Sequence, residues 1–133
     1  MKKIFISIVF GTRPELIKLA PVILLAKQDA RFQVEVIFTG QHDELVRDAI
    51  DFFGVEIDHR LKIMNAGQSL NQLLIHGLTQ LENIYTDGQK RDAIVIQGDT
   101  TTVLAAGLVA FSMKIPVAHV EAGLRSYDLD HPF

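Results

Sequence analysis

An apolar run passes directly into a helical pattern at residues 96–102, Ile96-Gln97-Gly98-Asp99-Thr100-Thr101-Thr102. The β-branched residues before Gly98 are typical of a strand buried in a parallel sheet, and the Ala- and Gly-rich residues from Thr101 to Met113 predict a buried helix. Asp99 therefore lies between a strand and a helix N-terminus, where peptide dipoles favour a negative charge. Capping the helix is the more common role of such an Asp, and a functional carboxylate is the alternative.

The alternation of strand and helix extends over the whole chain. Strands are expected at 4–10, 34–39, 93–97 and 116–121, with a possible short strand at 58–64, and helices at 14–27, 43–53, 69–85 and 101–113. Pro21 is expected to kink or split the first helix, because it lacks a backbone donor. This order predicts right-handed βαβ units in one α/β domain, with a Rossmann-like parallel sheet and helices on both of its faces.

The composition is that of a globular protein. With 133 residues, 48% of them hydrophobic and 22% charged, the chain is long enough for one core and too short for two domains. A net charge of −3 without a cluster of Lys or Arg argues against nucleic acid as a partner. No apolar run approaches the roughly 20 residues of a membrane span, so no membrane association is expected. The absence of cysteine is typical of a reducing compartment, which favours a cytoplasmic protein.

Ligands of open α/β sheets bind at the carboxyl ends of the strands, so the residues after each expected strand are the candidate site. Arg13 follows the first strand, and Lys18 lies about one turn into the next helix. Together with free backbone N–H groups, these cations suit a phosphate or a diphosphate. The alternative is a solvated surface pair of Arg13 with Glu15 or a neighbouring carboxylate. Residues 11–18 contain neither a G-x-G-x-x-G nor a Walker pattern, which argues against a nicotinamide or nucleoside-triphosphate enzyme.

The last expected strand ends with His119 and Glu121, which are two residues apart and so should share one face of the sheet. A carboxylate is a poor structural choice here unless something pairs with it, so Glu121 is a candidate functional residue, whereas His119 is interpreted as a core histidine. If the last two expected strands are neighbours, Asp99 and Glu121 face one crevice and can divide acid and base roles. Gln41 and His42 are expected at the rim of this crevice.

Neither a metal site nor a nucleophilic triad is expected, because no His-x-x-x-His, paired-acid or Ser-His-Asp arrangement is present. The core is expected to include Met64, Met113 and Phe111. The leucines of residues 70–81, which recur at helical spacing, are expected to join it.

Four segments lie at the ends of the expected strands. They are Phe10-Gly11-Thr12-Arg13-Pro14-Glu15 with Ile17-Lys18, Thr39-Gly40-Gln41-His42, Gln97-Gly98-Asp99-Thr100-Thr101-Thr102, and His119-Val120-Glu121-Ala122-Gly123-Leu124-Arg125. Together, in this order, they resemble the non-hydrolysing UDP-N-acetylglucosamine 2-epimerases over essentially the whole chain. The resemblance implies a two-domain enzyme of the glycosyltransferase-B type. This chain would be its N-terminal half, without the second domain and with little or no turnover alone.

The reaction that the resemblance implies is the interconversion of UDP-N-acetylglucosamine and UDP-N-acetylmannosamine. Because the C2 proton is not next to a carbonyl, the family eliminates UDP across C1 and C2. A 2-acetamidoglucal is left, and UDP is added back after protonation on the opposite face. By this resemblance Asp99 and Glu121 are two of the acid/base residues, and Arg13 and Lys18 are cations that contact the UDP-sugar substrate. No metal or nicotinamide cofactor is implied.

The sequence departs from the family pattern at a few positions. Gln97 stands where many members carry His, a change that we regard as minor. Gln41 and His42 resemble a substrate-binding loop, which in some members lies near a second, activating substrate molecule. Glu44 and Gly67 stand near it where regulated members carry a Gln and an Arg, so allosteric activation is not expected.

Two other functions remain open from the sequence. One is a sugar transferase of the same architecture that acts on another nucleotide sugar. The other is a non-catalytic module that binds an anion or a partner through Arg13 and Lys18. The helix expected at 69–85 can also provide the interface of a homodimer.

Overall fold

The computed structural model describes residues 2–40 and 44–132. Its elements, in chain order, are β1 (Ile4–Phe10), α1 (Arg13–Gln28), β2 (Phe32–Phe38), α2 (Glu44–Phe53), β3 (His59–Arg60), α3 (Leu70–Tyr85), β4 (Ala93–Gln97), α4 (Thr101–Ser112) and β5 (Val117–Val120). Each expected strand and helix is present, with ends that differ from the expectation by a few residues. The short strand expected at 58–64 is reduced to the two residues of β3.

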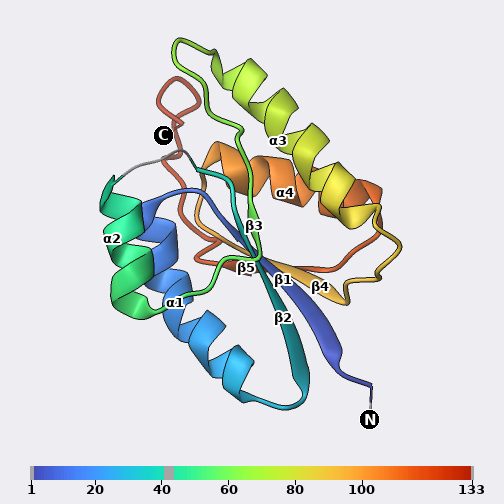
Figure 1. Cartoon of the computed structure of the whole chain (residues 1–133). Coiled ribbons are helices and arrows are strands. Elements are labelled where there is room, and N and C mark those ends of the chain that lie inside the picture. The colour runs from blue at the N-terminus through green and yellow to red at the C-terminus, as the bar shows by residue number, and fades with distance from the viewer. Residues whose placement is uncertain (1, 41–43, 133) are drawn as a thin grey trace.

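The strands form one parallel sheet with the order β3-β2-β1-β4-β5. From β1 the chain moves outward to β2 and β3, then crosses back to place β4 and β5 on the other side of β1 (Figure 1). The connections from β1 and from β4 leave in opposite directions. Open sheets of this type bind ligands at such a switch point, between the two strands. The α/β Rossmann-like fold class is therefore confirmed.

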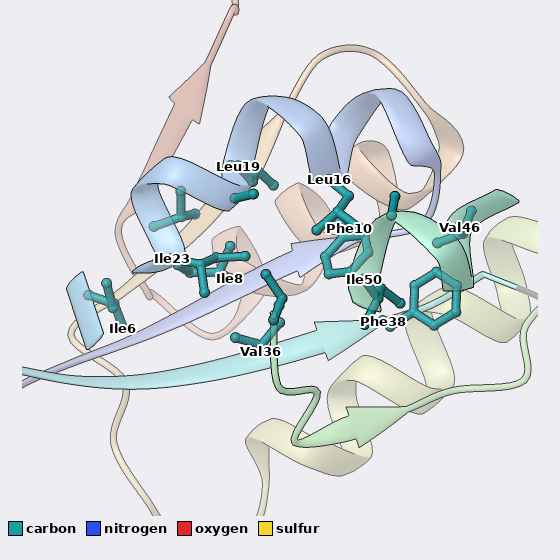
Figure 2. Packing of buried hydrophobic residues seen from close by; sticks show 14 residues of the cluster. Ile6, Ile8, Phe10, Leu16, Leu19, Ile23, Val36, Phe38, Val46 and Ile50 are labelled. Atoms are coloured by element: carbon teal, nitrogen blue, oxygen red, sulfur yellow. The ribbon is translucent and has the colours of Figure 1, made fainter. Parts of the chain in front are cut away.

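Helices α1 and α2 cover one face of the sheet (Figure 1). Ile8 and Phe10 of β1 pack there against Leu16 of α1 and Ile50 of α2, all of them 4% exposed or less (Figure 2). The rings of Phe10 and Phe38 lie 5.2 Å apart between centroids. Helix α1 begins where Thr12 caps it, its Oγ1 accepting a hydrogen bond from the backbone N–H of Glu15.

Helices α3 and α4 cover the opposite face, so helices lie on both faces as expected (Figure 1). The two helices approach closely because Gly77 of α3 faces Ala105 of α4, and a Cβ at Gly77 would lie 3.0 Å from the Ala105 methyl. Helix α3 begins with a capping box, in which Ser69 and Gln72 each accept from the other's backbone N–H. None of the helices in the described ranges has the length and apolarity needed to cross a membrane.

Several expectations about the core and the helices are wrong. Phe111 and Leu70 are 83% and 63% exposed, because α4 and α3 turn these side chains away from the sheet and β5 is an edge strand with little cover. Met64, in the segment between β3 and α3, is 42% exposed. Of the two outcomes expected at Pro21, a kink or a split, the split does not occur, because α1 continues through it from Arg13 to Gln28. A Pro in the second half of the helix therefore costs one hydrogen bond without ending it.

Candidate active site

The carboxyl ends of β1 and β4 enclose a crevice at the point where the chain order of the sheet reverses. A cavity of about 530 Å³ lies there. The turn after β1 contributes Gly11 and Thr12 to its lining, and the turn after β4 contributes Asp99 and Thr100. Apolar side chains of α3 and of the segment before it complete the wall, among them Leu74. The crevice thus combines backbone and hydroxyl groups on one side with an apolar surface on the other.

Asp99 does not cap α4, contrary to the more common role of an Asp at this position. The cap is Thr100, whose Oγ1 accepts from the backbone N–H of Val103 at 3.3 Å. Gly98, with a φ of +79°, turns the chain sharply between β4 and the helix. The exposed Asp99 carboxylate lines the cavity instead, and it forms no hydrogen bond to any part of the chain that the structure describes.

Glu15 joins the turns on the two sides of the crevice. Its side chain is 2% exposed, and its carboxylate accepts from the Gly11 backbone N–H at 3.0 Å and from the Thr100 hydroxyl at 2.9 Å. Burial raises the pKa of Glu15, while the hydrogen bonds from Thr12, Gly11 and Thr100 lower it. Because the Gly11 N–H is already used, the turn after β1 offers an anion fewer free donors than the sequence suggested.

Glu121 follows β5 and is held by two side chains from neighbouring elements. Lys18 of α1 forms an ion pair with its carboxylate, and the Gln97 amide at the end of β4 donates to Glu121 Oε2 at 2.5 Å. The hydrogen bond from Lys18 is the main reason that the pKa of Glu121 is lowered, and Gln97 adds to it. The group that pairs with this carboxylate is thus Lys18, a cation that the sequence analysis assigned to a bound phosphate or diphosphate.

The turn after β4 and the end of β5 are also joined through the backbone. The Gly98 N–H donates to the Val120 carbonyl at 3.0 Å, and His119 Nε2 donates to the Gly98 carbonyl at 2.6 Å. The expectation of a core histidine is wrong, because His119 is exposed on the edge strand. Glu121 has a φ of +58°, so the alternation of an extended strand stops at Val120 and no longer relates Glu121 to His119.

The remaining expected cation, Arg13, lies apart from this turn, and the two expected polar residues lie outside the described part of the chain. Arg13 lines a second cavity, of about 400 Å³, between α1 and α2 with the apolar residues Ile17 and Phe52. Within residues 2–40 and 44–132 it forms no ion pair with Glu15 or another carboxylate, so the alternative of a surface pair is not found there. Gln41 and His42 lie outside the residues that the structure describes.

Sequence reasoning missed Glu15 and Gln97 as parts of this site. A signal for Glu15 is present in Thr12-Arg13-Pro14-Glu15, which is the T-x-x-E pattern of a capping box and predicts a side chain folded back on the helix start. The observed carboxylate reaches one residue further, to Gly11. Gln97 carries no comparable signal, because its partner is 24 residues away on another strand.

The chemistry available here is that of carboxylates and cations. In the described part of the chain, no three His, Asp or Glu side chains gather as metal ligands. Asp99 and Glu121 follow the adjacent parallel strands β4 and β5. Lys18 and Gln97 contact the Glu121 carboxylate. Such groups can transfer protons to and from carbon or oxygen and can stabilise a negative leaving group.

Comparison with known proteins agrees with this fold. The family model described as UDP-N-acetylglucosamine 2-epimerase matches residues 25–133. The UDP-N-acetylglucosamine 2-epimerase of Neisseria meningitidis is 43% identical over 125 residues, which are 94% of this chain and 33% of that protein. The enzyme of the same name from Bacillus subtilis is 40% identical over 133 residues, all of this chain and 35% of that protein.

A solved structure leads to the same result. The crystal structure of UDP-GlcNAc 2-epimerase from Neisseria meningitidis bound to UDP-GlcNAc has a TM-score of 0.89 and 42% identity, over 97% of this chain and 35% of its own. The fold and the crevice define a Rossmann-like α/β protein with a cavity at its strand ends. The chain belongs to the UDP-N-acetylglucosamine 2-epimerase family. It spans about a third of the length of the curated relatives that it matches.

Proposed function

We propose that this chain supplies one domain of a two-domain enzyme that interconverts UDP-N-acetylglucosamine and UDP-N-acetylmannosamine. A base removes the C2 proton while the C1–O bond breaks and its electron pair leaves with UDP. Protonation of the resulting 2-acetamidoglucal at C2 on the opposite face, with return of UDP to C1, gives the epimer. The reaction is redox-neutral and consumes no other reactant.

The observation that carries this proposal is the Asp99 carboxylate, which lines the crevice and is not used as a helix cap. We assign acid/base roles to Asp99 and Glu121, because they follow the neighbouring strands β4 and β5. Lys18 and Arg13 are the cations assigned to the diphosphate, on which negative charge develops as the C1–O bond breaks. The structure of the Neisseria relative with UDP-GlcNAc supports this class of substrate.

The second domain is part of the same proposal. The crevice is walled by the sheet and by α3, and its remaining side is available to a domain that would bind the uridine and close over the sugar. Relatives about three times as long as the matched region support such an arrangement. We further propose that this chain alone has little or no turnover, that the full protein acts in the cytoplasm, and that α3 can serve in a homodimer.

A chimaera tests the reaction. Residues 1–133 replace the matching third of the Bacillus subtilis relative, to which they are 40% identical. We expect the chimaera to produce UDP-N-acetylmannosamine from UDP-N-acetylglucosamine, followed by ¹H NMR, and the chain alone to produce almost none. In deuterated water the product should carry deuterium at C2, because the proton is exchanged through the acid/base groups.

Substitutions in the chimaera test the site. Asp99→Asn and Glu121→Gln should each lower kcat by about 100-fold or more, the usual range for loss of a general acid or base. The matched controls are Asp51→Asn and Glu82→Gln. Both residues are exposed carboxylates within helices α2 and α3 and lie outside the strand-end turns of the site. Full activity in both variants would refute the assignment of Asp99 and Glu121 as acid/base residues. Binding of UDP by the chain with no product from the chimaera would favour a non-catalytic module.

A further inference from the structure

Gln97 is a buried polar residue at the end of β4. Gln97 is 4% exposed, and its backbone pairs in register with Val120 of β5. A buried amide is unfavourable unless it is hydrogen-bonded, and the amide nitrogen of Gln97 donates to Glu121 Oε2 at 2.5 Å. A rigid strand therefore holds the donor, and the acceptor is one of the two proposed acid/base carboxylates.

Glu121 needs such a holder because its own backbone does not fix it in a strand. Its φ of +58° lies in the left-handed region, which non-glycine residues adopt when their surroundings impose it. The residues after it, 122–132, are exposed and contain no helix or strand. The direction of the Glu121 carboxylate is therefore set by its side-chain partners, Gln97 and Lys18.

Lys18 cannot be the lasting partner if it also binds the diphosphate. It bonds the same oxygen as Gln97, Oε2, and its side chain is 47% exposed on a flexible stem. A diphosphate carries more negative charge than a carboxylate and draws the ammonium away from Glu121. Among the described residues, the side chains that donate to the Glu121 carboxylate are Lys18 and Gln97. Gln97 is the donor that remains.

We propose that Gln97 is a positioning residue that keeps the Glu121 carboxylate in its place at the ends of β4 and β5 after Lys18 has exchanged Glu121 for the substrate diphosphate. This inference rests on the proposed function, which makes Glu121 an acid/base group. Gln97 acts through Glu121 and touches neither the substrate nor the reacting carbon. In the structure Lys18 and Gln97 hold the carboxylate together, and in the substrate complex Gln97 holds it alone.

The first experiment titrates Glu121 in the 133-residue chain by NMR, with ¹³C-labelled glutamate. A hydrogen bond to the charged form lowers a pKa, so Gln97→Leu should raise the pKa of Glu121, whereas Gln97→His, which keeps an N–H donor, should change it less. Gln80→Leu is the matched control: it removes an amide bonded to the Lys62 carbonyl at 2.8 Å on α3, away from Glu121. An unchanged Glu121 pKa in Gln97→Leu overturns the inference, whatever the activity of the enzyme.

The second experiment measures the pH dependence of the chimaera. Gln97→Leu should lower kcat by about 10- to 100-fold, the cost of a misplaced catalytic group, with a smaller change in KM. It should also move the acidic limb of the kcat profile upward, because that limb reports groups in the substrate complex. Lys18→Met should raise KM and leave the position of that limb unchanged. Gln97→His should retain most of the activity, as should Gln80→Leu.

These outcomes separate the inference from the proposed function. A wild-type chimaera without epimerase activity refutes the proposed function, whereas an active chimaera that Gln97→Leu does not impair refutes only the role of Gln97. Equal losses in Gln97→Leu and Gln97→His would also refute it, because the donor would then not matter. A shift of the kcat limb by Lys18→Met would show that Lys18 stays on Glu121 in the substrate complex, which contradicts the exchange.

Discussion

Glu15 is the residue that couples the stability of the strand-end turns to pH. Burial raises its folded-state pKa above 4.5, so the folded chain binds this proton more tightly than the unfolded chain. Its contribution to stability is fully present below pH 4.5 and is lost as the pH rises through the folded pKa. Relative to Glu15→Gln, the free energy of unfolding of the wild type should therefore decrease over this range. Urea denaturation at a series of pH values measures the difference.

Asp87→Asn provides the control of opposite sign. The hydrogen bond from Arg91 lowers the pKa of Asp87 below 3.8, so its contribution is present above pH 3.8 and is lost as the pH falls through the folded pKa. The difference between wild type and Asp87→Asn should shrink as the solution is acidified. If the two difference curves have the same slope, the buried state of Glu15 does not determine its proton affinity.

Arg91 is a second residue whose substitution is expected to change the free energy of unfolding strongly. It is 1% exposed and donates through Nη2 and Nε to Glu35 at 2.7 and 3.2 Å, while its guanidinium lies 5.0 Å from the centre of the Phe5 ring. Arg91→Met leaves the 7% exposed Glu35 without its main cation and should lower the free energy of unfolding by about 3–5 kcal/mol. The double variant with Glu35→Leu should recover much of this loss. A loss below about 1 kcal/mol in Arg91→Met would contradict a buried ion pair.

At the scale of elements, the turn after β1 is packed against α4 so closely that no side chain fits. A Cβ on Gly11 would lie 2.5 Å from Thr102 Oγ1 and 2.6 Å from Thr39 Oγ1, two hydroxyls that bond each other at 2.7 Å. Gly11→Ala should therefore destabilise the chain by about 1–3 kcal/mol. In contrast, Gly107 within α4 has open space around it, and Gly107→Ala should stabilise the chain by about 0.5–1 kcal/mol. Chemical denaturation compares the two, and a similar effect of both would show that the contact at Gly11 relaxes.

For the whole molecule, periodicity in the sequence predicted the order of the strands and helices well. The spacing of apolar residues within each segment is enough to indicate whether that segment forms a strand or a helix. Ile4 to Phe10 is an apolar run interrupted only by Ser7, and the structure places β1 over the same residues. The spacing in 70–85 likewise predicted α3. Burial of individual side chains was predicted less well. Phe111 lies on a predicted helix, but its 83% exposure depends on β5 being at the edge of the sheet, which no local pattern reveals.

The candidate site was predicted in outline and not in its contacts. The strand-end rule predicted that Asp99 and Glu121 follow β4 and β5, as they do, since position along a βαβ chain determines which residues follow a strand. Asp99 lines the crevice, whereas Glu121 pairs with Lys18, and neither of these two residues lines it. The pairing of Lys18 with Glu121 joins residues 103 apart in the sequence, and the buried bond from Gln97 crosses between two strands. Such pairings depend on the register and on side-chain reach, which a single sequence does not specify. Whether Asp99 and Glu121 act on one sugar stays a prediction.

The edge of the sheet leads to a prediction about self-association. Strand β5 is exposed from Val117 to His119, and beside it Leu104, Leu108 and Phe111 of α4 are 51%, 42% and 83% exposed. An unpaired parallel edge next to an apolar surface favours pairing with another chain. We expect the 133-residue chain to associate in a concentration-dependent way, and Phe111→Glu to shift the sedimentation coefficient toward the monomer. The matched control is Phe52→Glu on α2, which removes an equally exposed aromatic and adds the same charge. If Phe52→Glu disrupts association and Phe111→Glu does not, the contact is the surface between α1 and α2 rather than the sheet edge.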